Sequence, residues 1–166
     1  MEYRAGMATV IRRFAETPAT PWRNGRGQTW PLFTETSWRL SVARLDDPAA
    51  FSSFPDLHRT FVPWGGGVRL EVDGEELDVR HGEIARFDGD ATTRLLALDH
   101  PCHAVNLMAS ESRPTLAVVA AGARLPDAAI AVLCAPIVDA ERFDVIRLDA
   151  REPLPADSVV VRLDGD

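Results

Sequence analysis

The feature of this sequence that most constrains its fold is a succession of short runs in which apolar and polar residues alternate. In residues 38–45, Trp38, Leu40 and Val42 alternate with polar or small side chains. This period of two is typical of a half-buried β-strand. Residues 68–72 repeat the pattern and lead into Asp73-Gly74, a dipeptide that favours a hairpin turn.

Similar runs recur at regular intervals along the rest of the chain. Residues 18–31 are expected to form a polar loop, and the alanine-rich segments 117–123 and 128–131 leave a helical alternative open. About a dozen short strands separated by turns predict an all-β sandwich or barrel. The further strands are expected over residues 9–14, 59–64, 76–80, 84–88, 94–98, 104–108, 116–121, 130–134, 143–148 and 159–163.

Composition and charge remove several classes of function. The chain has 166 residues and a net charge of −7, and all eighteen basic residues are arginines. Without lysine there is no Schiff-base lysine and no P-loop lysine. The acidic balance argues against nucleic acid or a membrane as a partner. Two cysteines, no long apolar run and no signal-peptide pattern predict a cytoplasmic protein.

A set of short motifs is more specific than the strand pattern. Residues 21–29 read Pro-Trp-Arg-Asn-Gly-Arg-Gly-Gln-Thr, which is unlike ordinary loop sequence. They are followed by Trp-Arg-Leu-Ser at 38–41, Phe-Ser-Ser-Phe-Pro at 51–55, Arg-Thr at 59–60, three glycines at 65–67, Phe-Asp-Gly-Asp at 87–90 and Asn-Leu-Met at 106–108. In this order and spacing, the segment from about residue 8 to 110 resembles the HutD/Ves family of bicupins.

The resemblance implies a fold and a function. Residues 1–166 would form one compact bicupin of two small fused cupin-like β-barrels (RmlC-like jelly rolls). The first, motif-bearing barrel would span residues 8–110, and residues 111–166 would form a shortened second barrel. Members of this family are associated with histidine-utilisation genes or stress responses, and the expected role is binding a small carboxylate.

The sequence departs from the family pattern at two places. After Thr29 the family usually has an Arg-Glu pair, where this chain has Trp30 and Pro31. Before Asn106 the family usually has Asp-Phe, where this chain has Ala104 and Val105. The missing charges imply a different ligand, a more apolar one, or none.

The histidines and cysteines do not match a metal or catalytic motif. Metal-binding cupins carry a His-x-His pair, and the four histidines (His58, His81, His100 and His103) include no pair at that spacing. No nucleophile elbow or activated cysteine is recognisable. The sequence therefore predicts no metal, no cofactor and no catalytic residue.

Arginines are the strongest candidates for contacting a ligand. Arg39 and Ser41 alternate with apolar residues, and Arg59 begins another expected strand. In a barrel, one face of each strand lines the cavity, where a guanidinium grips a carboxylate with two parallel hydrogen bonds. A solvent-facing position or a structural ion pair is the alternative for Arg39 and Arg59.

Polar groups beside aromatic residues complete the candidate site. Asn24 and Thr29 offer hydrogen-bonding groups next to an aromatic wall from Trp22, a mixture that suits a small-molecule pocket. Alternatively, Asn24 simply forms a tight turn pinned by Trp22. Asn106 is either a pocket group or a buried structural amide, whereas Phe51, Phe54 and Phe87 are expected to be core residues.

The sequence therefore predicts a non-metal cupin that binds a small carboxylate and modulates histidine or other amino-acid catabolism, or a stress response. One alternative is a cupin-type isomerase or hydrolase, which would need a matched acid and base in the cavity. The other is a dimeric interaction protein without a ligand, whose barrel interior would be filled.

Overall fold

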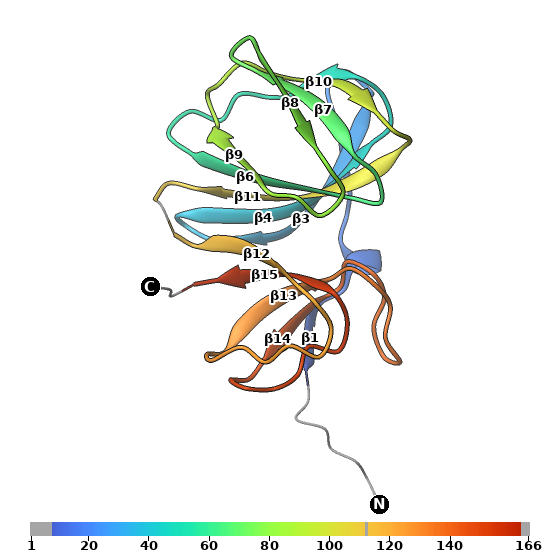
Figure 1. Cartoon of the computed structure of the whole chain (residues 1–166), viewed down its shortest axis with the longest axis vertical. Helices are drawn as coiled ribbons and strands as arrows, with labels where there is room; N and C mark the ends of the chain where they lie inside the picture. Colours follow the sequence, from blue (N-terminus) through green and yellow to red (C-terminus); the bar gives the residue numbers. More distant parts are fainter. Residues whose placement is uncertain (1–7, 112, 164–166) are drawn as a thin grey trace, which may run out of the picture. The chain divides into compact units, whose positions relative to one another are not determined.

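The computed structural model describes residues 8–111 and 113–163 (Figure 1). They form β-strands and one 3-10 turn, η1 (Phe14–Glu16), without an α-helix in the described part. The strands are β1 (Thr9–Arg12), β2 (Thr20–Pro21), β3 (Gly27–Thr34), β4 (Trp38–Leu45), β5 (Ala49–Ala50), β6 (His58–Trp64), β7 (Val68–Val72), β8 (Glu75–Val79), β9 (Ala85–Asp88), β10 (Thr93–Leu98), β11 (Cys102–Ala109), β12 (Thr115–Val119), β13 (Ala129–Leu133), β14 (Val145–Leu148) and β15 (Ser158–Arg162).

The predicted all-β class is confirmed, and the helical alternative for the alanine-rich segments is wrong. Those segments contribute to β12 and β13, because both strands find partners in a five-stranded sheet. Within the described residues there is consequently no helix of the length and apolarity that crossing a membrane would require.

The chain divides into two compact units, one of residues 18–115 and one that joins residues 1–17 to 116–166. Residues 1–7 and 164–166, which the sequence analysis assigned to the bicupin, lie outside the described residues. Segment 8–17 differs from the prediction, which placed it in the first barrel. Its strand β1 instead pairs antiparallel with β14, with Val10 opposite Ile146.

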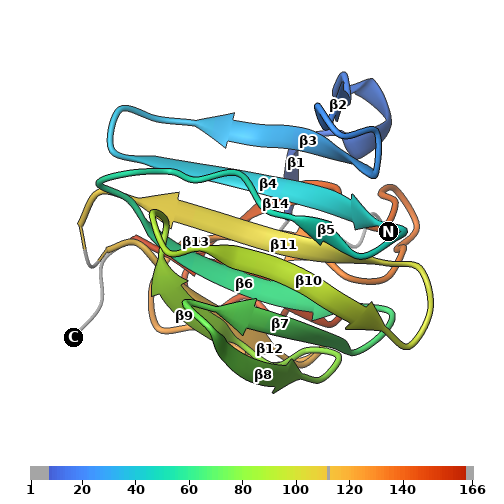
Figure 2. The same ribbon diagram turned by 90° about the horizontal axis from the view of Figure 1, so that it is seen from above.

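The unit of residues 18–115 is built from two sheets (Figure 2). One has the strand order β2-β3-β4-β11-β6-β9 and the other β5-β10-β7-β8, and both are open rather than closed barrels. Apolar side chains from both sheets form one core, as in a β-sandwich. It includes Leu45 and Phe61 from the first sheet and Leu70, Val79 and Leu95 from the second.

Strand β3 is the longest element that the sequence analysis missed, since residues 18–31 were expected to be a loop. The two-residue strands β2 and β5 were missed as well. Pro31 lies inside β3 and would normally interrupt a sheet. It is tolerated because β2 pairs only with Gln28 and Thr29, and because the pairing with β4 shifts between Pro31 and Phe33. The proline therefore sits at a bulge beyond the end of the neighbouring strand.

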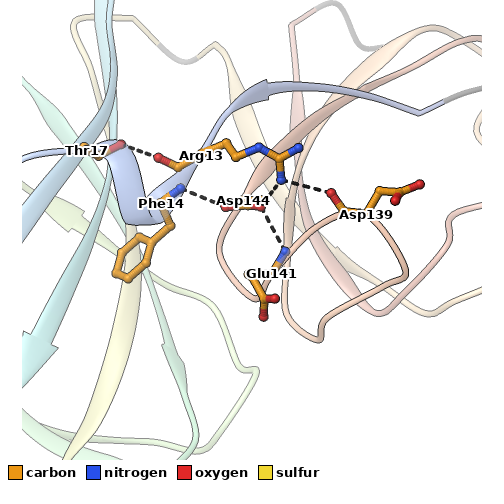
Figure 3. Close-up of polar contacts among 6 residues, drawn as sticks. All are labelled: Arg13, Phe14, Thr17, Asp139, Glu141 and Asp144. Carbon is orange, nitrogen blue, oxygen red and sulfur yellow. Dashed lines mark hydrogen bonds and ion pairs between the residues drawn. The ribbon is translucent and has the colours of Figure 1, made fainter.

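The other unit contains a single sheet of order β1-β14-β13-β15-β12 with its own apolar core, which includes Leu133, Ile146, Leu148 and Val160. Its N-terminal segment is fastened by one buried carboxylate (Figure 3). Asp144 is 1% exposed. It accepts hydrogen bonds from the backbone N–H of Phe14 (2.8 Å) and of Glu141 (2.9 Å), and from Arg13 Nη1 (3.2 Å).

A candidate anion-binding cavity

A cavity of about 400 Å³ lies on one face of the six-stranded sheet, within the unit of residues 18–115. The strand register explains which side chains reach it. Met108 of β11 is opposite Arg39 of β4 and Arg59 of β6, so these three form one row across the sheet. Two positions along, Asn106 is opposite Ser41. All five residues line the cavity, whose volume suits a small molecule.

The intervening residues of the same strands form an apolar opposite face. Leu40 and Val42 of β4 are fully buried, and Leu107 of β11 is 1% exposed. The alternation seen in residues 38–45 thus separates a cavity face from a buried apolar face. Arg39 is exposed to solvent and also lines the cavity. A solvent-facing position is therefore compatible with a position in the cavity wall.

Arg59 is the buried cation of the cavity, with 7% of its surface exposed. Its Nε donates a hydrogen bond to Asn106 Oδ1 (3.2 Å), and its Cζ lies 4.6 Å from the ring centroid of Phe51 and 5.7 Å from that of Phe87. Burial lowers the pKa of Arg59 to about 10, which still leaves it charged at neutral pH. None of the ion pairs found among residues 8–111 and 113–163 includes Arg59.

One wall of the cavity is made by Trp22 and the turn that follows it. The indole Nε1 donates to Thr29 Oγ1 (2.9 Å), and the ring packs edge-on against Phe51, with centroids 5.9 Å apart. Gly27 is required here, because a Cβ at this position would lie 2.9 Å from the Trp22 ring and 2.7 Å from the Arg44 carbonyl oxygen. Asn24 is exposed, and its Oδ1 accepts a hydrogen bond from the Arg26 N–H (3.0 Å).

The seven predicted ligand-binding residues all line this cavity, and whether they bind a ligand stays a prediction. They are Trp22, Asn24, Thr29, Arg39, Ser41, Arg59 and Asn106. Sequence reasoning missed Phe51 and Phe54, which were expected only in the core. Phe51 does pack on the core, but both rings also line the cavity, and Phe54 lies 5.3 Å from Arg39 Cζ. Both belong to the motif Phe-Ser-Ser-Phe-Pro at 51–55, which was the signal that could have identified them.

The charged side chains that line the cavity are all positive. The lining contains three arginines (Arg23, Arg39 and Arg59) together with hydroxyl, amide and apolar groups, and no Asp, Glu, His or Cys from the described residues. Nor do three or more of those residue types cluster as metal ligands anywhere in the described part of the chain. The cavity as described thus offers hydrogen-bond donors and positive charge, which suit an anion.

Two of the four histidines, His81 and His100, hold a turn that does not line the cavity. His81 Nδ1 accepts a hydrogen bond from the Gly65 N–H (2.8 Å), and His100 Nε2 contacts the Gly65 carbonyl oxygen. Asp99 accepts from the Gly67 N–H (3.1 Å). The three-glycine run is therefore a turn held by side chains from two other loops.

Comparison with known proteins identifies the family, because the HutD family model matches residues 14–153. The chain belongs to the HutD family. It is similar to the solved structure of HutD from Pseudomonas fluorescens SBW25, with a TM-score of 0.76, 22% identity, and 93% of this chain and 98% of that one covered. A conserved protein of unknown function from Pseudomonas aeruginosa PAO1 is similar with a TM-score of 0.69, 27% identity, and coverages of 93% and 97%.

A third relative is known by its position in a genome. An uncharacterised 21.2 kDa protein in the hutC 3′ region of Pseudomonas putida is 35% identical over 73 residues. The match spans 39% of this chain and 38% of that relative. The structural match to HutD confirms the predicted cupin-type all-β fold.

The positions at which the sequence is expected to depart from the family pattern fall at different places in this fold. Pro31 lines the cavity and is opposite Ser41. Trp30 packs instead near His103, with ring centroids 6.2 Å apart. Ala104 belongs to the sandwich core, where it is fully buried.

Proposed function

We propose that this HutD-family protein binds a small carboxylate in the cavity, anchored by Arg59, and that occupancy of the cavity modulates histidine or other amino-acid catabolism. The observation that carries the proposal is the burial of the Arg59 guanidinium without a carboxylate partner among the described residues. A buried charge is costly unless it is paired. A ligand carboxylate would supply the missing partner.

Three further observations support this function. The described lining has no acidic side chain to repel an anion, and it has no acid–base pair of the kind that the enzyme alternative needs. The related Pseudomonas fluorescens HutD structure is described as a formate condition, and formate is itself a carboxylate. The Pseudomonas putida relative lies in a hutC region.

The proposal is tested by thermal shift and isothermal titration with formate, urocanate, formylglutamate and formiminoglutamate. We expect at least one to raise the melting temperature in a concentration-dependent way, because a ligand that binds only the folded state stabilises it. Arg59→Gln should abolish the effect. Arg59→Lys should weaken binding about tenfold or more, since an ammonium group does not form the two-pronged contact.

The matched control is Arg94→Gln. Arg94 is an exposed arginine of β10 that does not line the cavity, so this variant should bind as the wild type does. Flat melting curves with all four compounds, or unchanged binding by Arg59→Gln, would overturn the proposal. Recovery of the bound compound unchanged after long incubation is expected of a binding protein, whereas its conversion would favour the enzyme alternative.

A further inference from the structure

The three cavity arginines are not equivalent. Arg59 is buried and held by Asn106 and two aromatic rings, whereas Arg23 and Arg39 are exposed. Neither Arg23 nor Arg39 forms an ion pair with a carboxylate of the described residues. Both line the cavity, so their charges lie where solvent meets it.

These exposed charges are opposite in sign to the net charge of the chain. The protein has a net charge of −7, so its average field repels small anions. Positive charges gathered at one opening reverse that field locally and raise the concentration of anions there. An exposed charge has a small effect on the stability of a bound complex but a large effect on the encounter rate.

We propose that Arg23 and Arg39 form an electrostatic entrance that concentrates small anions at the mouth of the cavity. Arg59 is the separate anchor inside. The inference rests on the proposed function in one respect only, namely that the cavity takes an anion. It adds a division of roles: the entrance sets how often an anion arrives, and the anchor sets how long it stays.

The backbone around Arg23 favours a fixed entrance over a mobile one. The Trp22 N–H donates to the Gly27 carbonyl (2.9 Å), and the Gly25 N–H donates to the Trp22 carbonyl (3.0 Å). Arg39 is held in register on β4 opposite Met108, and its guanidinium lies over the Phe54 ring. Both charges therefore originate from positions fixed by hydrogen bonds.

Trp22 is a built-in probe of this entrance, because its part-buried ring lines the cavity. The test is collisional quenching of Trp22 fluorescence by iodide, with neutral acrylamide as reference, in a Trp30→Phe/Trp38→Phe/Trp64→Phe background. Replacing both Arg23 and Arg39 by Gln should lower the iodide quenching constant about threefold at low ionic strength. Acrylamide quenching should stay unchanged.

The matched control replaces Arg86 and Arg94, two exposed arginines outside this cavity, by Gln. Both double variants lose the same charge, so an equal fall in iodide quenching would show a net-charge effect and overturn the proposal. The difference in iodide quenching between the two double variants should also vanish in about 1 M salt, where the screening length is about 3 Å. An unchanged iodide constant in the Arg23/Arg39 variant would likewise overturn it.

A second measurement applies if the triple tryptophan variant does not fold. The chain with its native tryptophans is labelled with fluorotryptophan, and broadening of the Trp22 fluorine resonance is compared between carboxy-PROXYL and its neutral carbamoyl analogue. The entrance predicts stronger broadening by the carboxylate probe, which the Arg23/Arg39 variant removes. Binding loss in Arg59→Gln is measured separately, so failure of the entrance and failure of the anchor are distinguishable.

Discussion

Arg59, the proposed anchor of the ligand, occupies a position that costs the protein stability. Its charge is buried, its Nε has one hydrogen bond to a neutral amide, and two aromatic rings cover it. Cation–π contacts recover about 0.5–2 kcal/mol each, whereas the desolvation of an ion costs several. Because desolvation costs more than these contacts recover, a binding role suits Arg59 better than a packing role.

Replacing Arg59 by methionine should therefore leave the free energy of unfolding within about 1 kcal/mol of wild type, or raise it. The same variant should lose the carboxylate-induced rise in melting temperature. Urea denaturation measures the first effect and thermal shift the second. Leu70→Ala, in the fully buried core, is the comparison and should cost about 2–5 kcal/mol. A similar cost for Arg59→Met would show that Arg59 is structural.

The two cysteines lead to a prediction about thiol chemistry. Burial raises the pKa of Cys102 to about 11 and that of Cys134 to about 12, from an ordinary value of 9.0. Since the thiolate is the reactive form, neither should react with a disulfide reagent at pH 8 until the protein unfolds. The release of the coloured product of that reagent, with and without denaturant, measures the reaction. Native-state reaction at the denatured rate would contradict it.

The same pKa shifts give the sign of a pH effect on stability. A raised pKa in the folded state means that the contribution of both thiols is fully present below about pH 9 and is lost as pH rises through 11 and 12.

At the scale of elements, strand β3 depends on Gly27 for its contact with the Trp22 turn. A methyl group there would collide with the Trp22 ring and the Arg44 carbonyl oxygen, and the carbonyl belongs to the paired strand β4 and has little freedom to move. Gly27→Ala should cost about 1–3 kcal/mol, shift the Trp22 emission and weaken carboxylate binding. Gln28→Ala, at an exposed neighbouring position, should do none of these things.

The accuracy of the sequence prediction at this scale follows the strength of the alternation. Residues 38–45 and 68–72 have strict alternation, and the strands occupy those residues. Strand β3 was not predicted because Pro31 and the glycines of the preceding turn suggest a loop. Only its pairing with β4 offsets this low intrinsic preference for a strand. The rows that place Arg39 beside Met108 and Arg59 depend on register, which alternation within single strands does not reveal.

The whole molecule shows the limit of local patterns most clearly. Residues 9–14 were correctly expected to contain a strand, but not as the partner of β14 far along the chain. The Asp144 carboxylate that fastens this segment had no signal in the sequence, because its partner Arg13 is 131 positions away. Long-range pairing of this kind is decided by the assembled core, which includes Ile146 and Leu148.

The last prediction concerns this fastening. Asp144→Ala leaves the Phe14 and Glu141 N–H groups without their acceptor, and it should lower the free energy of unfolding by about 2–4 kcal/mol. Asp144→Asn keeps an acceptor oxygen and should cost less.

Hydrogen exchange identifies where the loss occurs. Protection in the Asp144→Ala variant should fall in β1, β13 and β14, whose sheet the carboxylate serves, and persist in β4, β6 and β11 around the cavity. Equal loss throughout the chain would show that the two units unfold together, because local protection reports the cooperative unit to which each strand belongs. Carboxylate binding by this variant then tests whether the cavity depends on the fastened N-terminal segment.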